Sequence, residues 1–268
     1  MRKPSDIPLT YHVVGIVSVA VLLIAWQIAA QKGWISGYRF PAPTTVIAAW
    51  WELATLGFPD GVTMWAHVLA TLTRILEGFL LAVGLAIPLG FIIGWFPVLD
   101  RLSLPIITFA RSVATLSMLP LVIVWFGAGE LTKILLIAYG CFWVMLTNAI
   151  AAVKYVDSLL IQVAQSLEAR RVFIFFRVVL PAALPRLFAG GRIALGVGFM
   201  VIVGAEMIGT VKGLGALVME GRRFYRTDIT LAGMIAIGLL GFCISLGLGW
   251  LQRVVIPWHK GLNEVRRA

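Results

Sequence analysis

Charged residues interrupt stretches of this sequence that are otherwise apolar enough to cross a membrane. Arg111 and Glu206 each lie inside such a stretch, and Arg74 precedes Glu77 by three residues in another. An arginine in mid-membrane costs about 2.5–3.5 kcal/mol on insertion scales, so Arg111 should face protein or water. There it could help an anion to cross, or it could fix the helices through an ion pair. The spacing of Arg74 and Glu77 favours a local ion pair. Glu206 would repel an anion, and we expect it to pair structurally or to shape a gate.

The sequence lacks the usual motifs for nucleotide binding, for metal binding and for hydrolytic catalysis. The chain has no G-x-x-x-x-G-K-[ST] motif, so we do not expect it to bind ATP itself. His12, His67 and His259 are scattered, without the spacing of a metal site. Cys141 and Cys243 lie in apolar runs and are expected to be small hydrophobic residues. An intramembrane enzyme therefore has no residue pattern in its favour.

The composition indicates a membrane protein. Of the 268 residues 60% are hydrophobic and 13% are charged, and the mean hydropathy is +0.97. Soluble domains average about 45–50% apolar and about 25% charged residues, so a soluble enzyme, a disordered chain and a disulfide scaffold are excluded. A membrane helix needs about 20 residues. The sequence predicts an all-α protein with six such helices, at about 13–30, 65–94, 106–125, 131–153, 185–208 and 229–255.

The first 64 residues are predicted to form a separate part of the chain. The run at 13–30 could be a signal peptide, but its length and the spans after it favour an uncleaved helix. Pro43 and Thr44 resemble a helix start, and the paired Trp50 and Trp51 suit a helix lying at the membrane surface, on the periplasmic side. Residues 65–268 would then form the core, with a cytoplasmic loop at about 154–177.

The distribution of Lys and Arg predicts the orientation. The net charge is +10, which we attribute to basic cytoplasmic loops rather than to nucleic-acid binding. Seven basic residues would lie outside: Lys32, Arg39, Lys133, Lys212, Arg222, Arg223 and Arg226. Thirteen would lie on the cytoplasmic side with both termini: Arg2, Lys3, Arg101, Lys154, Arg170, Arg171, Arg177, Arg186, Arg192, Arg253, Lys260, Arg266 and Arg267.

The polar stretch after the fourth predicted span contains an amphipathic segment. Leu160, Val163, Ala164 and Leu167 fall at helical spacing, and Asp157 or Ser158 could cap the start. Arg170 and Arg171 are expected at the end of this helix, where cations favour the helix dipole. The helix could present one apolar face to a soluble partner, or it could lie on anionic lipid.

This segment resembles the EAA loop of ABC importer permeases, whose pattern is E-A-A-x3-G-x9-I-x-L-P. Ala164, Leu180 and Pro181 match the pattern, and Val178 takes the Ile place. Gln162, Val163 and Glu168 depart from it, with Glu168 in the glycine place. The surrounding sequence is similar to the taurine, alkanesulfonate and nitrate/bicarbonate branch, at Arg74–Phe79, Ile87–Gly90, Leu119–Leu121, Trp125–Gly127, Leu180–Pro185, Gly191–Ile193, Ala205–Met207 and Gly213–Gly215.

Two departures from the branch carry structural expectations. The branch has a proline-rich run after Arg111, whereas this chain has Ser112–Thr115, so we expect a straighter third helix there. Glu168 replaces a glycine, and because Glu prefers to continue a helix, we expect the helix to run through Glu168. Its side chain would then point towards Arg171 or a partner.

The resemblance implies the type I ABC importer permease fold and a transport role without enzymatic activity. Two copies would form a pathway in the bilayer, two ATPase subunits would bind ATP and Mg²⁺, and a periplasmic binding protein would deliver a small anion. Taurine or another sulfonate is the first expected cargo, and nitrate or bicarbonate is the second. A stand-alone secondary transporter is the rival class, but such transporters often contain inverted repeats and none is visible in this sequence.

The same resemblance suggests roles for individual residues. Arg170 and Arg171 could pair with acidic groups of an ATPase or face lipid and water. The expected ATPase contacts are Leu160, Gln162, Val163, Ala164, Ser166, Leu167, Glu168, Ala169, Arg170 and Arg171. Arg111, Met118, Glu206 and Met207 would line or gate the pathway, although the methionines could simply pack. Arg222, Arg223 and Arg226 would attract the anion or the binding protein, or form a hydrated loop.

Overall fold

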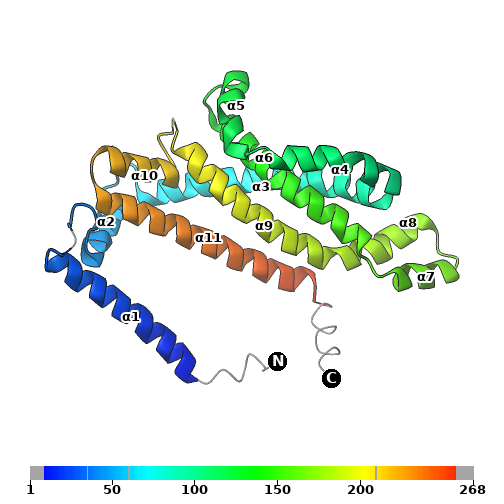
Figure 1. Ribbon diagram of the computed structural model, residues 1–268, viewed down its shortest axis with the longest axis horizontal. Coiled ribbons are helices and arrows are strands. Elements are labelled where there is room, and N and C mark those ends of the chain that lie inside the picture. The colour runs from blue at the N-terminus through cyan, green and yellow to red at the C-terminus, as the bar shows by residue number, and fades with distance from the viewer. Residues whose placement is uncertain (1–8, 35, 60, 209, 258–268) are drawn as a thin grey trace. The chain divides into compact units, whose positions relative to one another are not determined.

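A computed structural model describes residues 9–34, 36–59, 61–208 and 210–257. The basic residues predicted at both ends, from Arg2 and Lys3 to Arg266 and Arg267, lie outside these ranges. Every regular element in the described ranges is a helix (Figure 1). The elements are α1 (Leu9–Gln31), α2 (Pro43–Thr55), α3 (Met64–Trp95), α4 (Pro97–Ser112), η2 (Thr115–Met118), α5 (Leu119–Phe126), α6 (Glu130–Lys154), α7 (Ser158–Ser166), α8 (Arg171–Ile174), η3 (Phe175–Val179), α9 (Leu180–Glu206), α10 (Leu214–Arg223) and α11 (Thr227–Val255).

The all-α prediction is confirmed, and the long apolar helices agree with four or five of the six predicted spans. In the described residues, four helical stretches are long and apolar enough to cross a membrane: α3, α6, Arg171–Glu206 and α11. The bent pair α4 and η2–α5 makes a fifth if it is one span. The first predicted span falls on α1, where the apolar segment is Val17–Gln31. Six crossings therefore stay a prediction.

The third predicted span is not straight. The helices on either side of Val113 and Ala114 meet at 79°, so the expectation of a straighter helix is wrong. Both residues are extended, with ψ of 119° and 118°. Extended backbone suits the β-branched Val113. The end of α4 is stabilised without proline, because Tyr139 donates a 3.1 Å hydrogen bond to the Ala110 carbonyl.

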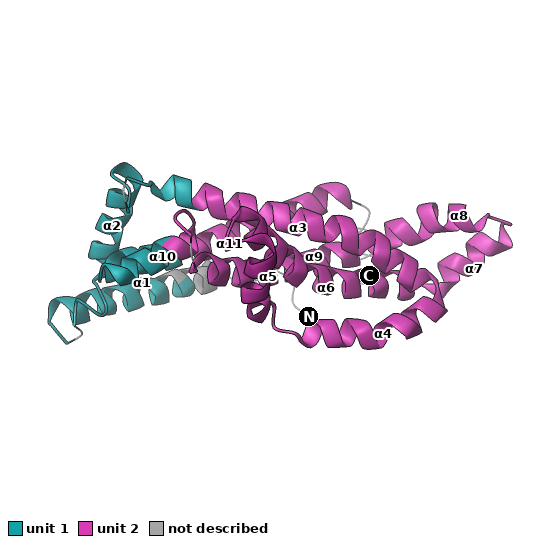
Figure 2. Ribbon diagram, turned by 90° about the horizontal axis from the view of Figure 1, so that it is seen from above, with its two compact units in different colours: residues 1–67, 217–236 teal, residues 68–216, 237–268 magenta. Residues whose placement is uncertain are grey.

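The described chain divides into two compact units (Figure 2). The first joins residues 1–67 to residues 217–236. It contains α2, which begins at Pro43 as predicted and buries Val46, Ala49 and Leu53. The opposite side of α2 exposes Ile47 and Trp51. That amphipathic character is consistent with the surface helix expected from the paired tryptophans.

The second unit, residues 68–216 and 237–268, has α6 at its centre. Half of the apolar window of α6 is buried, and α9 runs beside it (Figure 1). Glycines permit this close packing: a Cβ at Gly90 of α3 would stand 2.5 Å from the Ala149 Cβ, and one at Gly190 of α9 would stand 2.5 Å from the Asn148 Cβ. In membrane bundles, small residues let helix backbones approach in this way.

Candidate functional site

The predicted amphipathic segment is a short helix, α7, with a defined beginning and end. Asp157 caps it, because its Oδ1 accepts a 2.9 Å hydrogen bond from the Leu159 N–H. At the other end the Ala169 N–H donates to the Ala164 carbonyl at 3.1 Å, and the Glu168 N–H donates to the Gln165 carbonyl at 2.9 Å. This pair of bonds is a Schellman motif, which reverses the chain.

Glu168 therefore does not continue the helix, and that expectation is wrong. Its φ is +55°, the left-handed conformation that glycine adopts most easily. The local preference of Glu for helix is overridden by the two terminal hydrogen bonds. Arg170 and Arg171 also lie beyond the end of α7, since α8 begins at Arg171. The chain continues from there as helix to Glu206.

Replacing Glu168 by glycine should stabilise the chain by about 1 kcal/mol, because glycine adopts positive φ without the steric cost of a Cβ. The melting temperature of the detergent-solubilised protein measures the effect. Glu168→Ala removes the same carboxylate but keeps the Cβ, so it should leave the melting temperature nearly unchanged. A glycine variant that melts below the alanine variant would contradict this explanation.

Apolar side chains of α7 border an open groove. Leu159, Leu160, Val163 and Leu167 are all exposed, and Ala164 beneath them is only 8% exposed. The groove has a volume of about 690 Å³ and is completed by Ala169, Arg170, Phe173 and Val178. Gln162 and Ser166 are exposed outside its lining. Ala164 thus packs inward against the second unit, while its larger neighbours remain available to a partner.

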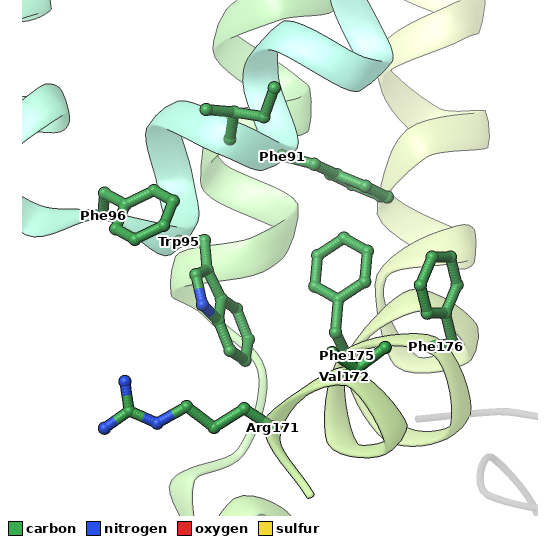
Figure 3. Close-up of a pocket in the computed structure, with 8 residues that line it drawn as sticks. Phe91, Trp95, Phe96, Arg171, Val172, Phe175 and Phe176 are labelled. Atoms are coloured by element: carbon green, nitrogen blue, oxygen red, sulfur yellow. The ribbon is translucent and has the colours of Figure 1, made fainter.

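The two arginines after α7 belong to different surfaces. Arg170 lines the groove beside α7. Arg171 instead lines a second pocket, together with aromatic residues from the end of α3 (Figure 3). A partner seated on α7 would therefore meet Arg170 directly, whereas Arg171 lies beside a separate pocket.

A partly buried ion cluster joins α3, α6 and α9. The Arg74 Nη1 donates to a Glu206 carboxylate oxygen at 2.6 Å, and its Nη2 donates to Glu130 at 2.8 Å. Lys133 pairs with Glu130 at 3.0 Å. The side chain of Glu206 has no exposed surface, whereas that of Glu130 is 60% exposed. Two cations and two carboxylates balance, which is how charges are tolerated in a membrane bundle.

The cluster also holds the loop after α9. Thr71 donates to Glu206 at 2.9 Å and accepts from the Leu214 N–H at 2.9 Å. The Gly215 N–H donates to Glu206 at 2.9 Å, and the Lys212 carbonyl accepts from Arg74 at 2.7 Å. Of the two roles expected for Glu206, the structure shows the pairing, and the role in a gate stays a prediction. The expected Arg74–Glu77 pair is wrong, because Arg74 binds two carboxylates far away in the sequence.

The other predicted pathway residues are not joined to this cluster. Arg111 is exposed in the last turn of α4 and forms no hydrogen bond or ion pair with the described part of the chain. Met118 packs partly against the apolar core around Leu119 and Ile137. Met207, at the end of α9, is partly buried. Sequence reasoning gave no site role to Thr71, Glu130 and Lys133, although the i, i+3 spacing of Glu130 and Lys133 at a helix start was a usable signal.

In the first unit, two of the three predicted outer arginines have acidic partners. Arg226 pairs with Glu52 at 2.7 Å and with Asp228 at 2.8 Å. Hydrogen bonds to Asp228 and then Glu52 raise the pKa of Arg226 above its usual range. Arg223 pairs with Glu220 at 2.6 Å, and Arg222 is exposed. Arg226 thus links α2 to the start of α11.

The family of binding-protein-dependent transport system inner membrane components matches residues 86–260. The chain belongs to this family. It is therefore a transport permease subunit and a multi-pass inner-membrane protein. Among the described residues, no group of three or more His, Cys, Asp or Glu could hold a metal ion.

Curated relatives and solved structures agree with this assignment. The chain is 41% identical to the taurine transport system permease protein TauC of Escherichia coli, over 94% of this chain and 92% of that protein. It is 32% identical to a candidate aliphatic sulfonates transport permease, SsuC of Bacillus subtilis, over 92% and 87%. The fold is shared with a chain of the MetNI methionine ABC transporter in its inward-facing form, with a TM-score of 0.61, 20% identity, and coverage of 72% of this chain and 97% of that one.

Proposed function

We propose that this permease carries taurine or a related sulfonate, delivered by a periplasmic binding protein and driven by two ATPase subunits that bind ATP and Mg²⁺. The similarity to TauC and SsuC supports the cargo. Two copies of the chain form the pathway across a two-fold axis, because each copy contributes one α7 and the two ATPases close on each other. Both termini and α7 are on the cytoplasmic side, in keeping with the excess of basic residues there.

The proposal that α7 couples the permease to the ATPase subunits rests on the exposed apolar side of α7 at the groove. Leu159, Leu160, Val163 and Leu167 are between 48% and 77% exposed. Arg170 adds a cation at the edge of the groove. A short helix with such a face fits a groove on a soluble partner. The ATPase contacts are therefore Leu160, Val163, Leu167 and Arg170, with Gln162 and Ser166 at the rim.

The helix after α7 gives a mechanical route for this contact. Ala164 of α7 shares a buried apolar cluster with Ile174 of α8 and Val179 of η3. From Arg171 the helix continues for 36 residues to Glu206, which is about 54 Å at 1.5 Å per residue. Glu206 accepts a hydrogen bond from the Gly215 N–H of the following loop, and its partner Arg74 donates to the Lys212 carbonyl of the same loop. A displacement of α7 is thus transmitted along α9 to the opposite end of the second unit (Figure 1).

The coupling proposal is tested by Leu160→Glu, which places a charge in the apolar contact. We expect ATPase co-purification to fall at least about tenfold, because an unpaired charge is desolvated on docking. Gln165→Glu is the matched control, since Gln165 is exposed on the same helix but lies outside the groove lining. Full ATPase binding and import by the Leu160 variant would overturn the assignment of α7.

The cargo is tested separately in proteoliposomes that contain the whole transporter and the binding protein. ATP-dependent uptake of labelled taurine, with nitrate and bicarbonate as competitors, distinguishes the two cargo classes. Uptake of taurine that neither inorganic anion inhibits is the expected result. Uptake of nitrate in place of taurine would overturn the sulfonate assignment while leaving the coupling assignment intact.

A further inference from the structure

The end of α3 forms an aromatic pocket with α8 and η3. The pocket has a volume of about 230 Å³ and is separate from the groove beside α7. Figure 3 shows the aromatic rings of the two sides facing each other. The lining consists of Phe91, Ile92, Trp95 and Phe96 from α3 and the following residue, and Arg171, Val172, Phe175 and Phe176 from α8 and η3.

Ring packing fixes the walls of this pocket. The Phe175 ring meets the Phe91 ring edge-on at 5.7 Å between centroids and the Trp95 ring edge-on at 5.4 Å. Such edge-to-face pairs are favourable arrangements that hold side chains in place. The pocket is therefore formed before anything enters it. Its outer lining is open to the surroundings, because Ile92, Phe96 and Phe176 are each at least 50% exposed.

The position of the pocket points to lipid. α3 is long and apolar enough to cross a membrane, and it ends at Trp95. Tryptophan and other aromatic residues gather where acyl chains meet headgroups. The apolar lining suits a stretch of one hydrocarbon chain, and a membrane helix end exposes it to lipid chains directly.

Arg171 defines the charge of the occupant. Among the described residues it is the only charged one in the lining. It is exposed and forms no ion pair within the described part of the chain. In Figure 3 its guanidinium extends away from the ring cluster, below Trp95. A cation beside an apolar pocket at the membrane surface complements an anionic phosphate above an acyl chain.

We propose that this pocket binds an anionic glycerophospholipid, with part of an acyl chain against Phe91, Trp95 and Phe175 and the phosphate on Arg171. The site goes beyond the transport role of the chain. It lies directly after the chain reversal at Glu168, so a lipid bound there would brace α8 against the end of α3.

The test measures retained lipid on the intact permease–ATPase complex. The complex is reconstituted in nanodiscs of equal parts phosphatidylglycerol and phosphatidylcholine, released into detergent, and examined by native mass spectrometry. We expect retention of phosphatidylglycerol over phosphatidylcholine. Arg171→Gln should lower phosphatidylglycerol retention about fivefold, the equivalent of about 1 kcal/mol for one basic residue at an anionic surface.

Two further variants separate the site from general attraction. Arg101→Gln removes an exposed arginine of α4 that is not in the lining, and it should leave phosphatidylglycerol retention unchanged. Ile92→Trp fills the pocket and should abolish retention of both lipids. If the Ile92 variant does not insert into the membrane, Val172→Phe fills the same pocket and is used in its place.

Three results would overturn the proposal. One is equal retention of the two lipids by the unmodified complex. Another is an equal loss with Arg101→Gln and Arg171→Gln, which would indicate general attraction to anionic lipid. The third is carbene footprinting in which Trp95 and Phe176 are shielded only when the ATPase or the second permease copy is bound, because the occupant would then be protein.

Discussion

Replacing Arg74 by methionine should destabilise the folded chain by about 3–5 kcal/mol, the largest effect that we expect from any single substitution. Glu206 is fully buried and Arg74 is its cationic partner, at 2.6 Å. Removal of one member of a buried pair leaves an uncompensated charge away from water, which costs that amount. Unfolding of the purified permease in mixed detergent, followed by circular dichroism, measures the loss.

A double variant separates the charge from the packing of the arginine side chain. In Arg74→Met/Glu206→Gln, the amide keeps an oxygen to accept from Thr71 and from the Gly215 N–H, which contact Glu206 in the native chain. Glu130 is 60% exposed and retains Lys133 as a partner. The double variant should therefore regain at least half of the lost stability. Purely additive losses would show that Arg74 and Glu206 are not coupled.

Local sequence rules worked where structure is local. The start of α2 at Pro43 and the amphipathic face of α7 were predicted, and Asp157 was one of the two residues expected to cap α7. Each of these features depends on residues a few positions apart. The long apolar helices were also predicted from composition, since a membrane segment needs only length and hydropathy. The resemblance to the family was a further signal, because it located α7 within the chain.

The same rules failed where contacts between distant residues determine the structure. Arg74 was assigned to Glu77 by helix spacing, but its partners lie 56 and 132 residues away. Glu168 was assigned to the helix by propensity, but the bonds to Gln165 and Ala164 end it. The glycine of the E-A-A-x3-G pattern at that place was the better guide to the backbone. The bend at Val113 was missed because proline was taken as its necessary cause.

The loop after α9 offers the second large effect. Gly213 has a φ of +143°, which residues with a Cβ rarely adopt. A Cβ built there would stand 2.5 Å from the Glu206 Oε1. Because the carboxylate is held by Thr71 and Arg74, it cannot withdraw without breaking the cluster. Gly213→Ala should therefore cost about 1–3 kcal/mol in backbone strain alone, and more as Glu206 is displaced.

Gly196→Ala provides the matched control for this substitution. Gly196 lies inside α9, and nothing stands within 4 Å of a Cβ built there. Alanine at that helical position should stabilise the chain by up to about 1 kcal/mol. The two glycine-to-alanine variants should thus shift the unfolding midpoint in opposite directions.

Measurements of transport distinguish a purely local effect of the Gly213 substitution from an effect on the proposed coupling between α7 and this loop. If α9 transmits motion from α7 to the Lys212–Gly215 loop, Gly213→Ala should impair ATP-driven uptake while ATPase subunits still co-purify, because α7 itself is unchanged. The experiment compares uptake and ATPase binding in the same membranes for both glycine variants. The Gly213→Ala variant could instead match the parent protein in its unfolding midpoint and its ATP-driven uptake. That result would show that the ion cluster tolerates a side chain there and does not hold this loop.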